Sequence, residues 1–132
     1  MITEDYVSFE TAKLLKEKGF NEEVICYYDD GGSLNLNKFV EFQCCNEGYG
    51  SSVFAAPTLQ ITMKWLREVH HLYIQVMLDS WACGGHMGYY VVIQNTTSDF
   101  EMMLQDALDD VFYDTYEEAC EAAIKYCLDN LI

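Results

Sequence analysis

Positively charged side chains are scarce in this sequence. Seven Lys and Arg stand against 22 Asp and Glu, which gives a formal net charge of −15 with the His residues neutral. The imbalance is greatest in residues 72–132, which hold eleven acidic side chains and a single base, Lys125. Nucleic acids and anionic membranes are bound largely through Lys and Arg, so this charge argues against both as direct ligands. The remaining expectation is a basic protein partner or self-association.

Long hydrophobic runs are absent as well. No stretch of 18 consecutive apolar residues occurs, which predicts that no segment spans a membrane. The first residues carry neither a basic flank nor a long apolar run, so we expect no secretory signal and a cytoplasmic location. In that reducing compartment the six cysteines are expected to be thiols: Cys26, Cys44, Cys45, Cys83, Cys120 and Cys127.

What the sequence does contain is enough apolar material for a folded domain. Hydrophobic residues make up 51% of the 132 positions and aromatic ones 14%, and both fractions exclude a disordered acidic chain. The length predicts one globular domain over residues 1–132 with its own core. Ser8 is a plausible N-cap for a helix over about 9–18, and Pro57 precedes a second helix over about 58–71. Thr115 with Glu118 forms a capping box for a helix that runs to the end.

Between these helices the sequence predicts two hairpins. The first joins residues 24–28 to residues 39–44 through the turn Asp29-Asp30-Gly31-Gly32, and residues 52–55 can add a short strand. The second joins residues 72–78 to residues 89–94. Residues 100–112 fit either a strand or a helix, and we favour a short strand followed by an acidic loop. The predicted class is α+β, in the order α-β-β-(β)-α-β-β-(β)-α, with antiparallel hairpins forming one sheet and helices packed on one face.

The most chemical-looking motif is Cys83-Gly-Gly-His86, because two metal ligands three positions apart on a glycine-rich loop can reach one ion. A structural zinc site needs two such pairs, and the available partners, Cys44-Cys45 and His70-His71, are adjacent residues that point to opposite faces of a strand. Cys83 and His86 are therefore weak metal candidates. The simpler interpretation is a hairpin loop, so we predict no metal, no cofactor and no assigned catalytic residue.

Other catalytic patterns are incomplete or have simpler explanations. No strand-to-helix elbow surrounds a Ser or Cys nucleophile, and neither glycine pair has the frame of a phosphate-binding loop. Cys120 and Cys127 share a helix face and are expected to be buried. The acidic residues at positions 106, 109, 110 and 114 lack the spacing of a calcium loop and are expected to be solvated. Strand tyrosines at positions 27, 28, 73, 89 and 90 are expected mainly to pack in the core, although an exposed row would suit a protein interface.

Three segments of the chain, Ser8–Phe20, Ala56–His70 and Thr115–Ile132, resemble a family of small acidic proteins from gut anaerobic bacteria and their phages. The family has no assigned activity, cofactor or site. The shared segments coincide with the predicted helices, whereas Cys83–His86 and Asp99–Asp114 lie outside the shared pattern. The resemblance implies an accessory protein of a phage or mobile element.

Three function hypotheses follow from the sequence. The leading one is a non-enzymatic acidic accessory protein that works by binding a protein partner. The second is a small metal- or thiol-dependent enzyme that uses Cys83 and His86. The third is a structural subunit whose role is to assemble with copies of itself.

Overall fold

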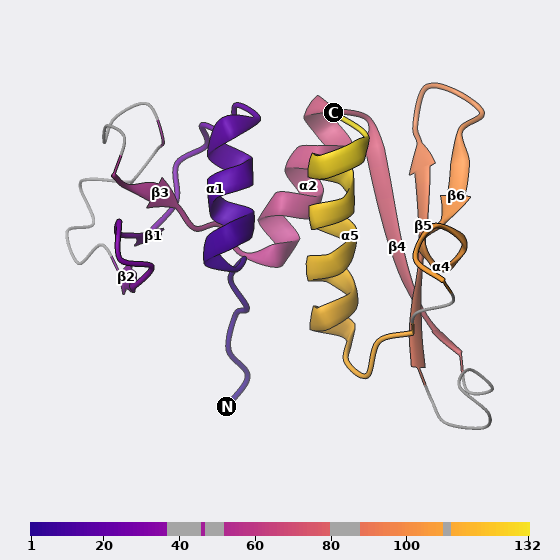
Figure 1. Ribbon diagram of the computed structural model, residues 1–132, viewed down its shortest axis with the longest axis horizontal. Coiled ribbons are helices and arrows are strands. Elements are labelled where there is room, and N and C mark those ends of the chain that lie inside the picture. Colours follow the sequence, from indigo (N-terminus) through magenta and orange to yellow (C-terminus); the bar gives the residue numbers. More distant parts are fainter. Residues whose placement is uncertain (37–45, 47–51, 80–87, 110–111) are drawn as a thin grey trace. The chain divides into compact units, whose positions relative to one another are not determined.

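The computed structural model describes residues 1–36, 46, 52–79, 88–109 and 112–132 (Figure 1). It confirms the α+β class, with helices and antiparallel strands alternating along the chain roughly in the predicted order. The elements are α1 (Phe9–Glu17), β1 (Cys26–Tyr28), β2 (Leu34–Leu36), β3 (Phe54–Ala55), α2 (Leu59–Val69), β4 (Leu72–Asp79), β5 (Gly88–Asn95), β6 (Glu101–Met103), α4 (Leu104–Ala107) and α5 (Tyr116–Asn130).

The chain divides into two compact units. The first comprises Met1–Leu59 together with Ile132, and the second comprises Gln60–Leu131. Each unit contains its own three-stranded antiparallel sheet, ordered β2-β1-β3 in the first and β4-β5-β6 in the second. The two predicted hairpins therefore belong to separate sheets and not to one, because each finds its third strand locally.

The sheet of the first unit is short and centres on β1. Cys26 pairs with Leu36 on one side, and Tyr27 pairs with Ala55 on the other. The β1–β2 turn is closed by Asp29, whose carboxylate accepts hydrogen bonds from the backbone N–H groups of Ser33 and Gly31, both at 3.0 Å. Both bonds lower the pKa of Asp29 below its usual value, and the bond from Ser33 has the largest effect. The strand expected over residues 39–44 lies outside the described residues, and β2 pairs with β1 in its place.

Helix α1 covers this short sheet. Its predicted N-cap is confirmed, since the Ser8 hydroxyl accepts a 3.2 Å hydrogen bond from Thr11 N–H. Phe9 lies against the rings of Tyr28 and Phe54, with centroid distances of 5.4 and 5.6 Å. Gly32 has a φ of +80°, and a Cβ there would lie 3.1 Å from the Phe9 ring. This turn thus favours glycine on both backbone and packing grounds.

A buried asparagine links separate parts of the first unit. The Asn46 side chain donates to the Phe20 carbonyl at 2.6 Å and accepts from Ala55 N–H at 2.9 Å. Asn46 and Phe20 are both buried. This one side chain thus joins the Phe20 carbonyl to the Ala55 N–H.

The second unit has a longer sheet. β4 and β5 pair over their whole length, from Leu72 opposite Asn95 to Asp79 opposite Gly88. β6 pairs with the C-terminal half of β5. Helix α5 packs against β4 and β5, as its position beside β4 in Figure 1 shows. Its predicted cap is confirmed, because the Thr115 hydroxyl accepts from Glu118 N–H at 3.1 Å. Small and branched side chains on α5 are fully buried: Ala119, Cys120, Ala123 and Ile124.

Two sequence predictions need correction in this unit. Within residues 100–112, the predicted short strand is confirmed as β6, but a one-turn helix, α4, follows where we expected a loop. Its residues Leu104 and Gln105 are buried, and burial of an apolar side chain favours ordered structure over a solvated loop. The helix predicted over 58–71 ends at Val69, since His71 adopts a φ of +60° that no helix allows. Among the described residues no helix is long and apolar enough to cross a membrane.

Candidate functional site

The β4-β5-β6 sheet has one face that α5 does not cover, which we call the open face. Strand side chains alternate between the two faces, so the register assigns every position. The buried face includes Leu72, Ile74, Val91 and Ile93, all of which are at most 5% exposed. The open face consists of four cross-strand rows: Tyr73, Gln94 and Glu101; Gln75, Val92 and Met103; Met77 with Tyr90; and Asp79 with Gly88.

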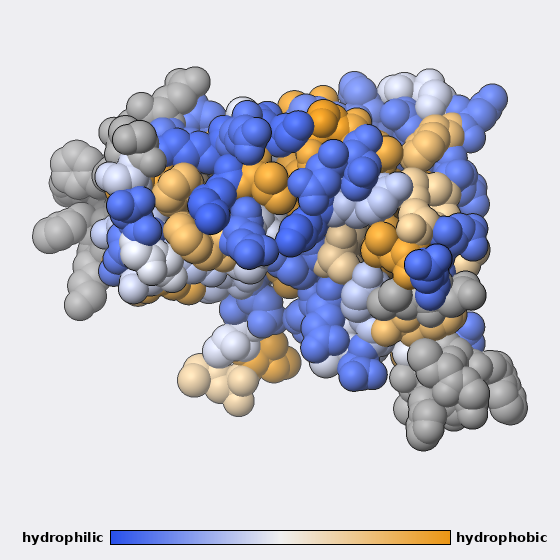
Figure 2. Space-filling model, viewed as in Figure 1, coloured by the Kyte–Doolittle hydropathy of each residue, from blue (hydrophilic) through white to orange (hydrophobic). Residues whose placement is uncertain are grey.

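Large apolar side chains on the open face remain accessible to solvent. Tyr73 and Met77 are each 41% exposed and Met103 is 38% exposed, while Tyr90 and Val92 are half-buried. Scattered exposed apolar residues are normal on protein surfaces, and here the exposed ones lie on the two outer strands, with half-buried Tyr90 and Val92 between them on β5. Most of the surface visible in Figure 2 is hydrophilic, with hydrophobic residues in separate patches. The open face thus differs from the acidic surface that the composition predicts.

A chain of side-chain hydrogen bonds crosses the open face. Gln75 donates its amide N–H to the Gln94 carbonyl oxygen, and Gln94 in turn donates to Glu101 Oε2 at 3.0 Å. Gln94 is bonded on both sides, and Gln75 and Glu101 are each bonded to Gln94. These hydrogen bonds orient the three side chains across all three strands. The chain of hydrogen bonds ends on the Glu101 carboxylate, which lies beside the apolar residues of the face.

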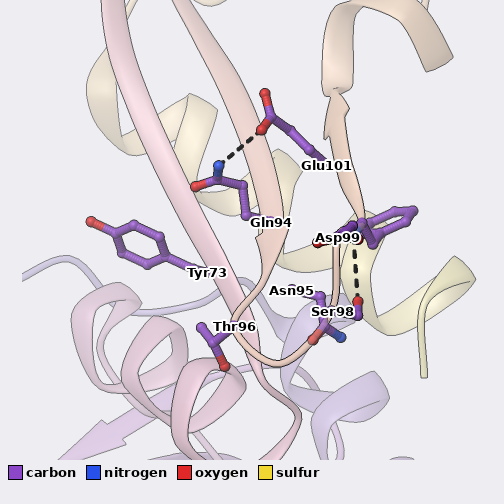
Figure 3. Close-up of a pocket in the computed structure, with 8 residues that line it drawn as sticks. Tyr73, Gln94, Asn95, Thr96, Ser98, Asp99 and Glu101 are labelled. Atoms are coloured by element: carbon purple, nitrogen blue, oxygen red, sulfur yellow. Dashed lines mark hydrogen bonds between the residues drawn. The ribbon is translucent and has the colours of Figure 1, made fainter.

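A pocket of about 440 Å³ lies at the end of the sheet where β5 turns into β6. Tyr73, Gln94 and Glu101 line it from the three strands, and Ser98 and Asp99 line it from the turn (Figure 3). None of its eight lining residues, all of them described, is basic. The pocket therefore carries two carboxylates and no positive charge, which favours a ligand with a cationic or hydrogen-bond-donating group.

The open face presents amide, phenol, thioether and carboxylate groups. Its ten residues include no Cys, His, Ser, Thr or Lys. Among the described residues no group of three or more His, Cys, Asp and Glu side chains is placed to hold a metal ion. The arrangement fits recognition by contact.

The predicted metal candidates Cys83 and His86 lie outside the described residues, as do Cys44 and Cys45. His70, a possible second ligand, packs its ring edge-on against Trp65 at 4.7 Å. Its Nε2 is buried and has no hydrogen-bond partner among the described residues. Burial, and then the neighbouring His71, lower the pKa of His70 and favour its neutral form.

The helix thiols are buried, as the sequence predicted. Cys120 and Cys127 are both fully buried on α5. Burial raises the pKa of Cys120 to about 11 and that of Cys127 to about 12. A thiol with such a pKa is protonated at neutral pH and is a poor nucleophile. The acidic residues Asp106, Asp109 and Asp114 are exposed, as expected of solvated side chains.

Sequence reasoning found only part of the open face. It placed Tyr73 and Tyr90 on strands and allowed an exposed tyrosine row, but it assigned no role to Gln75, Met77 or Met103. The alternation of Tyr73, Gln75 and Met77 along one strand was the available signal. Comparison of the chain with protein-family models, curated proteins and solved structures finds no match.

Proposed function

We propose that this protein is a non-enzymatic acidic accessory protein that works by binding a basic protein partner through the open face. The observation that carries the proposal is the exposure of Tyr73 and Met77 on β4 and of Met103 on β6, all on the face of the sheet opposite to α5. Protein interfaces typically place aromatic and Met side chains at their centre and polar groups at the rim. The phage or mobile-element setting comes from the sequence resemblance.

Charge defines the chemistry of the partner. Residues 60–131 hold twelve acidic side chains against three basic ones, a formal charge of −9. On the open face and its adjoining pocket the charged groups are Asp79, Asp99 and Glu101, all acidic. A partner that offers apolar side chains surrounded by Lys and Arg would match this surface in both respects. The same charge opposes direct contact with nucleic acid.

The test is affinity capture with matched variants. Immobilised full-length protein is compared with Met77→Asp on the open face and Ile61→Asp on α2, where the original side chains are 41% and 46% exposed. Both substitutions add one negative charge at an exposed apolar position of the second unit. We expect a basic protein that is retained by the wild type and Ile61→Asp, is lost with Met77→Asp, and elutes as salt is raised.

Two outcomes would contradict the proposal. Equal retention of the same partner by Met77→Asp and Ile61→Asp would show that the open face does not carry the interaction. Retention that does not weaken with salt would exclude a charge-complementary partner.

A further inference from the structure

Strand β4 is the outer strand of the second sheet, and its sequence has little that would prevent pairing at its outer edge. The strand order places β4 at one end, with β5 on one side and no described strand on the other. Natural edge strands are commonly protected by Lys, Pro or an inward-pointing charge. Over Leu72–Leu78 the sequence is Leu-Tyr-Ile-Gln-Val-Met-Leu, with none of these devices and no charge at all.

The direction of the backbone groups on β4 follows from printed hydrogen bonds nearby. Thr96 N–H donates to the His71 carbonyl at 2.8 Å, so residues 71 and 96 form a hydrogen-bonded pair of the β4–β5 ladder. Hydrogen-bonded and non-hydrogen-bonded pairs alternate in an antiparallel ladder. The odd-numbered residues of β4 therefore bond to β5. The even-numbered ones direct their N–H and C=O groups to the free edge: Leu72, Ile74, Val76 and Leu78.

These four residues define a register in which the strand pairs with itself. When two β4 strands lie antiparallel about a twofold axis at Gln75, Leu72 meets Leu78 and Ile74 meets Val76 of the second copy. No other antiparallel register pairs all four outward-facing residues with one another. The side chains also match, because Leu faces Leu, Ile faces Val, and Tyr73 faces Met77, all typical cross-strand partners.

From this geometry we propose that the protein forms a symmetric dimer in which the β4 edges of two copies pair about Gln75 into one six-stranded sheet. The occupant of the edge is a second copy of this chain, since its own β4 supplies the complementary strand. At each end of the register Asp79 of one copy lies opposite His71 of the other, a carboxylate facing an imidazole. The inference goes beyond the proposed function, because it rests on the backbone groups at the edge of β4; the side chains of Tyr73 and Met77 on the open face border the same seam.

Electrostatics gives this dimer a signature opposite to that of the proposed partner complex. Each chain carries a formal charge of −15, so two copies repel each other over long range, while residues 72–78 of the paired strands are uncharged. Salt screens the repulsion and leaves the strand pairing intact. Dimerisation therefore strengthens with salt, whereas binding to a basic partner weakens with it.

The first experiment is sedimentation velocity of the full chain at about 0.05 M and about 0.5 M NaCl, conditions that shorten the screening length roughly threefold. We expect the dimer fraction to rise with salt. The variant Gln75→Lys places two ammonium groups opposite each other on the twofold axis and should weaken the dimer about tenfold or more, since like charges in contact across an interface are costly. The matched control, Gln94→Lys, breaks the same Gln75–Gln94 hydrogen bond and adds the same charge one strand away from the edge.

A monomer at both salt concentrations would overturn the proposal, and so would a dimer that Gln75→Lys and Gln94→Lys affect equally. Either result leaves the binding of a basic partner open to its own test, so the two proposals fail separately.

A second experiment reads the register directly. In a chain with Cys44→Ser, Cys45→Ser and Cys83→Ser, the variant Gln75→Cys should form a disulfide-linked dimer with glutathione disulfide as oxidant. Only residue 75 lies opposite itself, and Cα atoms of paired residues are within disulfide reach. Tyr73→Cys should cross-link only when it is mixed with Met77→Cys. Cross-linking of Gln94→Cys as fast as that of Gln75→Cys would contradict the predicted pairing.

Discussion

In the second sheet β4 and β5 run for eight residues each, whereas the strands of the first sheet have three residues or two. The long sheet is held by a continuous ladder and by the burial of one face under α5. The short sheet depends on side chains that reach across it. Tyr28 donates to the Val7 carbonyl at 2.7 Å, Lys16 donates to the Val53 carbonyl at 2.7 Å, and Asn46 bonds in two directions.

This comparison explains why the open face belongs to the second unit. A sheet that is stabilised by its ladder and one buried face can leave its other face unused for folding. Side chains there can then be selected for binding. In the first unit Tyr28 and Asn46 form hydrogen bonds that hold the strands, while Leu34 and Leu36 on β2 are exposed.

The largest effect is expected from removing packing in the long sheet. Ile93→Ala deletes a fully buried side chain on the α5-covered face of β5 and should cost about 2–5 kcal/mol of unfolding free energy. The matched control is Val92→Ala, one residue along on the open face, which should cost less than half as much. Hydrogen exchange of the β4 and β5 amides measures the loss of unfolding free energy in both variants. Equal losses would show that the two faces are not different in burial.

The short sheet should respond most to loss of a polar side chain. Asn46→Ala leaves the Phe20 carbonyl and Ala55 N–H without their partner and should cost about 1–3 kcal/mol, measured by hydrogen exchange of the β1 and β3 amides. The control is Asn35→Ala, which removes a part-buried hydrogen bond to Asp29 and should cost much less unfolding free energy than Asn46→Ala. A neutral Asn46→Ala would refute the claim that side chains hold this sheet.

The cap of α5 should contribute less. Thr115→Ala removes the acceptor for Glu118 N–H and should cost about 1 kcal/mol by urea denaturation followed by circular dichroism. Thr115→Ser keeps the hydroxyl and should restore most of the loss. If Thr115→Ser is as destabilising as Thr115→Ala, the hydroxyl is not what stabilises the helix start.

The smallest effect near neutral pH concerns the α5 thiols. Folding raises the pKa of Cys120 to about 11 and that of Cys127 to about 12, above the ordinary value of 9.0. The folded state therefore holds these protons more tightly than the unfolded state, and the associated stability is complete below pH 9. It is lost progressively as the pH rises through about 11 and 12. Urea titrations should show no pH dependence from the thiols up to about pH 9 and a decline in stability above it, which Cys127→Ala should reduce.

Local signals in the sequence predicted the local structure well. Ser8 and Thr115 identified two helix starts because a cap depends on residues three positions away. The alternation of residues along the chain identified β4 and β5, because it too is a local pattern. The split into two sheets was not predictable in this way, since the pairing of Tyr27 with Ala55 joins residues far apart in the chain. Helix α4 was missed because the burial of Leu104 is a tertiary effect.

The open face was predictable only in part. The sequence shows that Tyr73, Gln75 and Met77 share a face, but which face α5 covers depends on how the helix docks. The hydrogen-bond chain from Gln75 to Glu101 requires the register of all three strands. Cys83 and His86, the candidates that the motif search favoured, lie outside the described residues.

The side of β5 away from β4 is closed by three different parts of the chain. Residues of β6 pair with one half of it, the Gln105 side chain accepts from Val91 N–H at 3.2 Å, and Tyr113 exchanges backbone hydrogen bonds with Tyr89 at 2.8 and 3.0 Å. At the outer edge of β6, Glu101 and Met103 are the two strand residues that direct backbone groups away from β5, and Glu101 is charged. The sheet thus has one edge suited to growth and one that is not. Pairing through β4 therefore stops at two copies, and a protein with a bare hydrophobic edge avoids polymerising into a fibre.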